Sequence, residues 1–242
     1  MEVDILVVEH EFSIVESIKI ACAACPYRFT TIRSGRAAVE IAKHTQYALI
    51  ILDALLPDMS GIEVCRELRN TLSSNQQVPI IVLGAPCSNE AVKLTVFQAG
   101  ADDYLVKPFS YAELAARIKV WTRRMKLEED TILDLDKIEG GFSGMQIRHL
   151  RIDPDKRKVT LKGREVILSR MEYELLVLLA RNAGRAYSRF ELLRLVWGLD
   201  SAVYEKNVTC LITRLRQKIE INPENPSVLQ TVRGFGYRIA EE

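Results

Sequence analysis

The chain has 242 residues, of which 48% are hydrophobic and 27% are charged, so it suits two domains with real cores. Every long apolar run is interrupted by a charge before about 18 residues, which excludes a transmembrane helix. The N-terminus lacks the basic segment of a signal peptide, so we expect a cytoplasmic protein with no membrane partner. Its five cysteines fit reduced thiols better than a disulfide framework.

The net charge of +1 conceals an uneven distribution along the chain. Residues 1–126 hold 14 basic and 14 acidic side chains, residues 127–146 hold one and six, and residues 147–242 hold 18 and 12. The middle stretch is also rich in glycine, which is typical of a connector between domains. The basic C-terminal region is predicted to meet a polyanion.

Residues 1–126 alternate between strand-like and helix-like stretches. Short apolar runs predict strands at 4–8, 29–33, 48–52, 79–83 and 103–106. Helical spacing of apolar residues predicts helices near 12–24, 36–44, 60–70, 88–99 and 110–125. Five βα units in this order predict an α/β domain with a doubly wound, five-stranded parallel sheet and helices on both faces.

The central feature of this half is an aliphatic run at 49–52 that stops on Asp53. Such a strand is buried on both faces, and open α/β sheets place their chemistry at the carboxyl ends of these strands. Asp53 alone would be read as a cap on the next turn. Because Glu9 and His10 close the first predicted strand and Lys107 closes the fifth, we expect a polar cluster at this edge of the sheet.

Two cysteines, Cys22 and Cys25, form an isolated C-x-x-C pair at the end of the first predicted helix. A structural zinc site needs four ligands, and no second pair occurs at suitable spacing. We interpret both thiols as helix packing, with redox sensing as the alternative.

Residues 147–242 begin with strand-like pieces near 148–152, 157–161 and 165–167. Helices follow, because Ser169 and Ser188 each precede a glutamate by three positions, the spacing of a capping box. A third helix is predicted over 204–220, and the chain ends in a hairpin. This part is therefore expected to be a smaller α+β domain.

The predicted helix over 204–220 carries apolar residues on one side and a polar arc on the other. The arc consists of Lys206, Thr209, Cys210, Thr213, Arg214, Arg216 and Gln217. A basic helical face is usually only solvated surface. Here it belongs to the third helix before a hairpin with Arg233 and Arg238, which is the layout of a winged helix-turn-helix. We expect the arginines Arg214, Arg216 and Arg233 to contact DNA phosphates. The residues expected to face base edges are Lys206, Thr209, Cys210 and Thr213.

Both halves resemble one known family. The cluster at Glu9, Asp53 and Lys107 resembles the receiver domain of two-component response regulators. Trp197-Gly198, the stretch 214–218 and the stretch 231–237 resemble the OmpR/PhoB-type DNA-binding domain. The resemblance implies a receiver at 1–126, a linker at 127–146 and a winged-helix DNA-binding domain at 147–242.

This resemblance also implies a function. Asp53 would be the phosphoacceptor, a sensor histidine kinase its phosphodonor, and promoter DNA and RNA polymerase the partners of a transcription regulator that is not an enzyme. An Asp after a parallel strand also begins haloacid-dehalogenase-type phosphatases, but these need a second acid two positions on, where Leu55 stands.

The resembling receivers hold Mg²⁺ with two acidic residues after the first strand and the acceptor Asp. Here Glu9 and Asp53 are present, but His10 replaces the second acid. An imidazole is a softer ligand and removes a negative charge, so Mg²⁺ binding is expected to be weak or absent. Protonated, His10 could instead offset the acidic cluster without a metal.

A second departure lies at position 84, where similar receivers have Thr or Ser. That hydroxyl bonds a phosphoryl oxygen and carries the switch towards the aromatic at position 104. Gly84 can do neither, whereas Tyr104 and Lys107 are retained. We therefore expect an atypical receiver with little or no dependence on phosphorylation; the alternative is a conventional kinase-driven regulator phosphorylated at Asp53.

The resemblance further implies a homodimer through the fourth helix, fifth strand and fifth helix of the receiver. The matching positions carry charges of the expected sign, which pair Lys93 with Glu113, Asp103 with Arg117, and Asp102 with Arg124. The alternative is that these are ordinary solvated charges, because an exposed pair contributes only about 0.2 to 1 kcal/mol.

Overall fold

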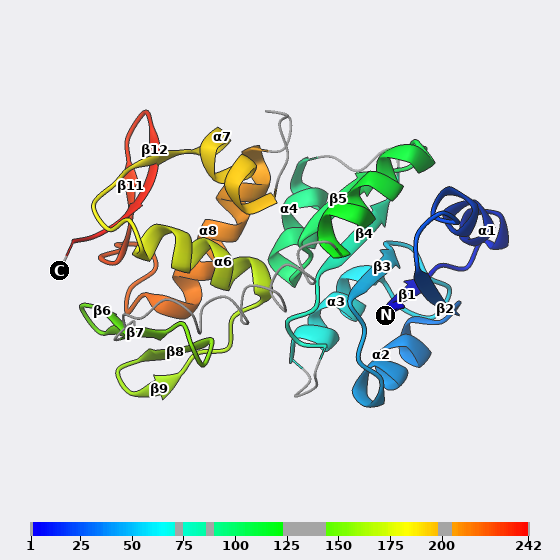
Figure 1. Ribbon diagram of the computed structural model, residues 1–242, viewed down its shortest axis with the longest axis horizontal. Helices are drawn as coiled ribbons and strands as arrows, with labels where there is room; N and C mark the ends of the chain where they lie inside the picture. Colours follow the sequence, from blue (N-terminus) through cyan, green and yellow to red (C-terminus); the bar gives the residue numbers. More distant parts are fainter. Residues whose placement is uncertain (1, 71–74, 86–89, 123–143, 198–204, 242) are drawn as a thin grey trace. The chain divides into compact units, whose positions relative to one another are not determined.

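The computed structural model describes residues 2–70, 75–85, 90–122, 144–197 and 205–241 (Figure 1). The chain forms two compact units, Met1–Lys137 and Ile138–Glu242. Most of the connector expected at 127–146 lies outside the described residues. None of the described helices has both the length and the apolar character needed to cross a membrane.

The N-terminal unit is built on a parallel sheet with strand order β2-β1-β3-β4-β5. Its strands are β1 (Val3–Val8), β2 (Tyr27–Ile32), β3 (Leu49–Asp53), β4 (Ile80–Gly84) and β5 (Asp103–Val106). Every residue of β3 and β4 is buried, as their all-apolar sequences predict. This topology confirms the predicted doubly wound sheet.

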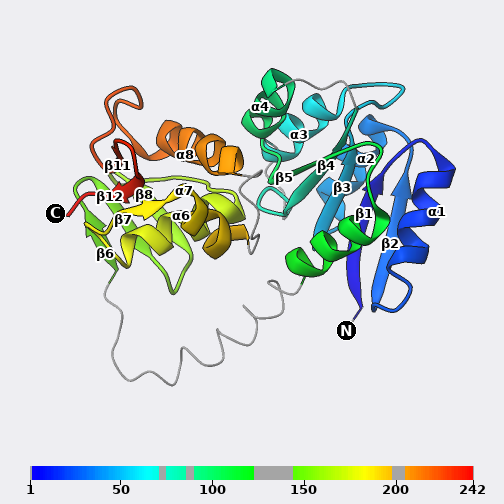
Figure 2. The same ribbon diagram turned by 90° about the horizontal axis from the view of Figure 1, so that it is seen from above.

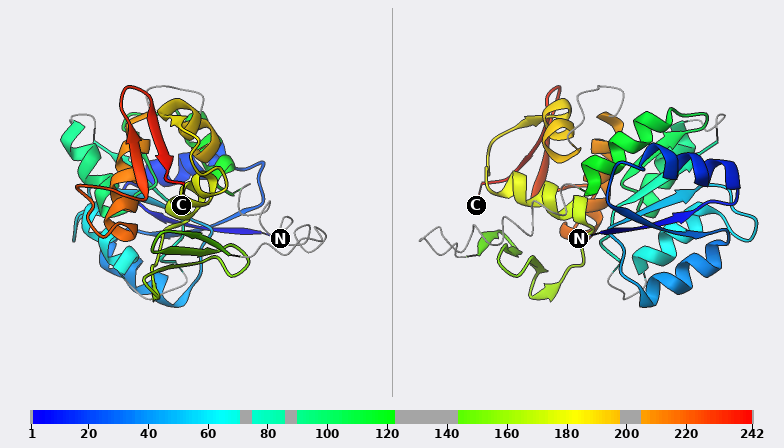
Figure 3. Two further views of the ribbon diagram at one scale, coloured as in Figure 1. Left: turned by 90° about the vertical axis from the view of Figure 1, so that its left-hand side faces the viewer. Right: turned by 45° about the vertical axis from the view of Figure 1, so that its right-hand side comes forward.

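Helices cover both faces of this sheet. They are α1 (Phe12–Ala21), α2 (Gly35–His44), α3 (Gly61–Asn70), α4 (Glu90–Ala99) and a helix that covers 111–122. α2 packs on α3 and α3 packs on α4. Figures 2 and 3 show α1 and the helix at 111–122 on one side of the sheet and α2 and α3 on the other.

The segment after Asp53 is fixed by two close contacts. The Asp58 carboxylate accepts hydrogen bonds from the backbone N–H groups of Arg36 (3.0 Å) and Gly35 (2.8 Å) and from Ser34 Oγ (2.8 Å). These bonds lower the pKa of Asp58 to about 2. Gly61 begins α3 so close to β3 that a Cβ on it would lie 2.4 Å from the Asp53 carbonyl oxygen. The loop that follows Asp53 is therefore held against the sheet.

The C-terminal unit contains two small antiparallel sheets. One consists of β6 (Met145–Ile147), β7 (Leu150–Asp153), β8 (Lys158–Leu161) and β9 (Arg164–Glu165). The other has the order β10-β12-β11, formed by β10 (Tyr187–Ser188), β11 (Leu229–Val232) and β12 (Gly236–Ile239). The expected C-terminal hairpin is thus joined by a third, short strand.

Three helical segments pack against one another in this unit: α6 (Arg170–Ala180), α7 (Arg189–Leu192) continued by the π-helix η1 (Leu193–Trp197), and α8 (Glu205–Ile219). Capping boxes begin α6 at Ser169 and α7 at Ser188, as the sequence predicts. The arrangement is the predicted winged-helix fold, with β11 and β12 as the wing.

One predicted strand begins too early. The strand predicted near 148–152 is β7 (Leu150–Asp153), because Arg148 and His149 form the two-residue turn that joins β6 to β7. Arg148 has a φ of 55°, in the left-handed region that usually favours Gly or Asn. Because neither Arg148 nor His149 is a typical turn residue, the sequence does not mark this turn. Leu150 and Ile152 alternate inward within β7, as the predicted strand requires.

Candidate functional site

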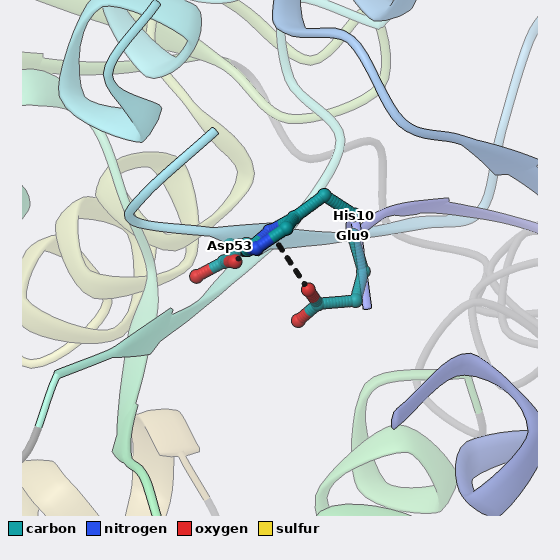
Figure 4. Close-up of side chains that lie close together, drawn as sticks. All are labelled: Glu9, His10 and Asp53. Carbon is teal, nitrogen blue, oxygen red and sulfur yellow. Dashed lines mark hydrogen bonds and ion pairs between the residues drawn. The ribbon is translucent and has the colours of Figure 1, made fainter. Parts of the chain in front are cut away.

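The polar side chains predicted to meet at the carboxyl edge of the parallel sheet lie together (Figure 4). His10 Nδ1 is 3.1 Å from Asp53 Oδ2 and 3.3 Å from Glu9 Oε1. Lys107 Nζ is 2.8 Å from Glu9 Oε2 and 3.2 Å from Asp53 Oδ1. The two carboxylates are therefore bridged twice, by the imidazole on one side and by the ammonium on the other.

Burial determines the electrostatics of this cluster. Glu9 is 1% exposed and Asp53 3% exposed, whereas the His10 side chain is 43% exposed. Burial raises the pKa of Glu9, and the charge of Asp53 raises it further. The hydrogen bonds from the Glu11 N–H and from Lys107 lower this pKa, but they do not cancel the rise. Burial works to lower the pKa of Lys107, but its ion pairs with Glu9 and Asp53 prevail and raise it. The pocket therefore contains its own fixed cation.

Glu9, His10 and Asp53 could also hold a metal ion, because their ligand atoms all lie within 4.8 Å of one another. Mg²⁺ prefers a near-octahedral shell of oxygen atoms. The cluster supplies two carboxylates and one imidazole nitrogen, so the donor set departs from that shell at His10.

Tyr104 occupies the space beside Gly84. A Cβ placed on Gly84 would lie 1.7 Å from Tyr104 Oη and 2.0 Å from its Cζ. The tyrosine is only 6% exposed, its ring lies 6.5 Å from the ring of Phe97, and Lys93 Nζ lies 5.8 Å from its centre. The phenol thus fills the position where the resembling receivers have a hydroxyl side chain, which the sequence could not reveal.

Part of the expected dimer face is engaged within the chain. Arg117 Nη1 lies 2.6 Å from Asp103 Oδ2, and its Nη2 lies 2.7 Å from Glu113 Oε1. Asp102 Oδ2 accepts from Arg69 Nη2 at 2.6 Å and from the Ile80 N–H at 2.9 Å.

These contacts correct one expectation. Asp102 and Asp103 are 3% and 1% exposed, so neither carboxylate is a surface charge that faces a second copy in this structure. No sequence signal marked Arg69 as the partner of Asp102, because the two residues are far apart along the chain. Arg124 lies outside the described residues, and a dimer that involves Lys93 and Glu113 stays a prediction.

The exposed face of α8 is narrower than the predicted polar arc. Thr209, Thr213 and Gln217 are exposed at spacings of four residues, so they form one stripe along the helix. The wing adds Arg233 and Arg238, which are also exposed. Lys206 lies outside the described side chains.

Arg216 lies between α8 and the wing. Its guanidinium donates to the Leu229 carbonyl oxygen (2.9 Å) and to Thr231 Oγ1 (2.8 Å), and it lies 5.7 Å from the ring centre of Tyr237. It therefore positions the wing relative to α8 and remains half-buried beside the exposed stripe.

Two predicted DNA contacts are wrong. Cys210 is 5% exposed and Arg214 is 6% exposed, so both side chains lie in the core. Arg214 Nε is 3.0 Å from Glu172 Oε1 and its Nη2 is 3.2 Å from Ser169 Oγ. The spacing of apolar residues in α8 predicts that a charged side chain such as Arg214 faces outward. It does not reveal that the partner of Arg214, Glu172, is buried on α6.

Glu172 explains why Arg214 is buried. The sequence predicts only one role for Glu172, as part of the capping box at Ser169. Burial works to raise its pKa, but the charges of Arg214 and of Lys218, whose Nζ is 2.7 Å from Glu172 Oε2, lower it to about 2. The carboxylate is therefore an ionised anchor between α6 and α8.

Comparisons with known proteins agree with this geometry. The family described as "Response regulator receiver domain" matches residues 5–119, and "Transcriptional regulatory protein, C terminal" matches residues 163–239. The probable transcriptional regulator ycf27 of Cyanophora paradoxa is 37% identical over 235 residues, which cover 96% of this chain and 94% of that protein.

Two further comparisons span nearly the whole chain. The DNA-binding response regulator MtrA of Mycobacterium tuberculosis H37Rv is 36% identical over 97% of this chain and 95% of that protein. A solved structure of a RitR variant has a TM-score of 0.75 at 28% identity and covers 99% of this chain and 100% of that one.

Proposed function

The chain belongs to the DNA-binding response regulators, and we propose that it is of the OmpR/PhoB type and binds DNA with little or no dependence on phosphorylation of Asp53. It is a DNA-binding transcription regulator and not an enzyme. The family implies promoter DNA and a cognate histidine kinase as partners.

The packing of Tyr104 against Gly84 carries this proposal. A phosphorylation switch requires an element with two arrangements whose balance the phosphoryl group changes. Here position 84 has no hydroxyl to bind a phosphoryl oxygen, and the tyrosine already occupies the space of the missing side chain. Phosphorylation of Asp53 would therefore have little effect on the position of Tyr104.

The ligands of the pocket support the same proposal. With His10 in place of an acid, Mg²⁺ binding is weak or absent, and phosphoryl transfer to a carboxylate relies on such an ion to neutralise charge. Lys107 already pairs with both carboxylates and so supplies part of that neutralisation without a metal.

A conventional, kinase-driven regulator remains the second candidate. Asp53 ends β3 at the sheet edge and Lys107 Nζ lies 3.2 Å from its Oδ1, so the nucleophile and one donor for a phosphoryl group are both present. Under either candidate, we propose that the protein acts as a receiver-paired homodimer and engages RNA polymerase at the promoter.

Phosphoryl uptake at Asp53 separates the two candidates. We expect that wild-type protein incubated with acetyl phosphate and Mg²⁺ shows little shifted band on a phosphate-affinity gel. His10→Asp restores an oxygen ligand and is expected to take up more. An Asp53→Asn variant reports any modification at other positions. Near-complete modification of the wild type would instead favour the conventional regulator.

A further inference from the structure

The donor set beside Asp53 differs in chemistry from a magnesium site, and we infer that it binds a first-row transition-metal dication, such as Zn²⁺ or Co²⁺, in preference to Mg²⁺. The proposed ligands are Glu9, His10 and Asp53 (Figure 4). This inference does not require Asp53 to be phosphorylated or unphosphorylated in the cell, because it concerns the cluster itself.

Two of the three distances between ligand atoms of the cluster match those around a single ion, and the carboxylates of Glu9 and Asp53 lie within 4.8 Å of each other. Zinc-type bonds to nitrogen and oxygen are about 2.0 to 2.2 Å, so neighbouring ligand atoms of one ion lie about 2.9 to 3.5 Å apart, from octahedral to tetrahedral geometry. His10 Nδ1 lies 3.1 Å from Asp53 Oδ2 and 3.3 Å from Glu9 Oε1. The imidazole nitrogen is therefore at ligand-to-ligand spacing from both carboxylates.

The carboxylates are also oriented by other groups. Glu9 Oε1 accepts from the Glu11 N–H at 3.0 Å, while Lys107 holds Glu9 Oε2. Asp53 Oδ1 accepts from the Leu55 N–H at 3.2 Å and contacts Lys107, which leaves Oδ2 turned towards His10. Outer hydrogen bonds of this kind fix metal ligands in place and strengthen metal binding.

The identity of the third ligand selects the class of metal. Imidazole suits zinc, copper, iron and nickel, whereas carboxylate and water suit magnesium. Mg²⁺ also releases its water reluctantly and gains little from a neutral nitrogen ligand. The His10 ring is 43% exposed, so an ion can reach the cluster and keep water molecules as its remaining ligands. The buried carboxylates and the exposed imidazole together make an accessible mixed-ligand site.

Cobalt titration of the full chain tests this inference. We expect one Co²⁺ to bind with absorption bands typical of oxygen and nitrogen ligands, and Mg²⁺ in large excess to displace it poorly. His10→Ala should weaken Co²⁺ binding by about 10-fold to 100-fold or more. His10→Asp should weaken Co²⁺ binding as well, while Mg²⁺ now competes effectively.

His149→Ala is the matched control, because His149 lies in the β6 to β7 turn of the other unit and should leave Co²⁺ binding unchanged. Intense thiolate-to-cobalt absorption would assign the ion to a cysteine site and would overturn the inference. So would Co²⁺ binding that His10→Ala leaves intact, or equal competition by Mg²⁺ in the wild type. If His10→Ala fails to fold, His10→Asn removes the ligand with a side chain of similar polarity and gives the same comparison.

Discussion

Tyr104 and Gly84 show how one missing side chain is compensated by a neighbour. Because Tyr104 Oη lies where a Cβ would be, any side chain at position 84 must displace the phenol. Gly84→Ala is expected to destabilise the receiver by about 1 to 3 kcal/mol, the usual cost of overpacking.

A double-mutant cycle checks the cause of that loss. In the Tyr104→Ala background, Gly84→Ala should cost much less, because the space is then open. The measurement is urea unfolding of the full chain, with the transition of the C-terminal unit as an internal reference. Additive losses from the two substitutions would contradict the packing seen at Gly84.

Arg214 and Glu172 make a second prediction at the residue scale. Arg214→Met should destabilise the C-terminal unit by about 3 to 5 kcal/mol, because it leaves the Glu172 carboxylate buried without its arginine. Pairing it with Glu172→Gln should recover part of the loss. Thermal unfolding of Arg214→Met, Glu172→Gln and the double variant tests this prediction. An Arg214→Met protein that is fully stable but binds DNA more weakly would instead identify Arg214 as a DNA contact.

The pKa of Glu172 adds a pH dependence. Its value of about 2 in the folded protein is below the ordinary 4.5, so its contribution to stability is full above about pH 4.5 and declines as the pH falls towards 2. Glu172→Gln should therefore reduce the loss of stability in this window. Unfolding midpoints measured across the window for both proteins provide the test, and parallel curves would contradict it.

At the scale of elements, we predict that α8 and the wing present the DNA-binding surface. If Arg233 contacts a phosphate, Arg233→Ala should weaken binding to specific and unrelated DNA alike and reduce the salt slope by about one. About six such contacts would give the wild type a log-log slope near −5.

The matched control for Arg233 is Lys156→Ala, which removes the same charge from an exposed position in the turn between β7 and β8. Fluorescence anisotropy over a range of salt concentrations measures both variants. Equal effects of the two substitutions would show that only the overall charge matters and that the wing makes no particular contact.

The elements also show what a sequence can and cannot reveal. All-apolar runs at β3 and β4 predicted the buried parallel strands, and serine-glutamate spacing predicted the starts of α6 and α7. The strand predicted at 148–152 begins instead at Leu150, because Arg148 turns the chain without a typical turn residue.

The candidate site was also predictable only in part. The sequence correctly predicted the acidic cluster, because the carboxyl ends of parallel strands bring the side chains that follow them together. They did not reveal that Tyr104 fills the space at Gly84, or that Arg214 points inward to Glu172, because both facts depend on contacts between distant elements.

At the scale of the whole molecule, dimerisation without phosphate remains a prediction that involves Lys93 and Glu113. Lys93→Glu should weaken the dimer, since a twofold axis repeats each charge pair, and adding Glu113→Lys should partly restore it. Sedimentation of the unphosphorylated full chain at micromolar concentration is the measurement. A monomer under these conditions, or a dimer unaffected by either change, would place the interface elsewhere.

DNA affinity of the full chain, measured with and without acetyl phosphate and Mg²⁺, tests most directly whether the receiver acts without phosphorylation. We predict that the two affinities differ by less than about fivefold, the lower end of typical allosteric coupling, and that Asp53→Asn binds like the wild type. A larger rise in affinity with the phosphodonor that disappears in Asp53→Asn would contradict the proposal and establish a conventional phosphorylation switch.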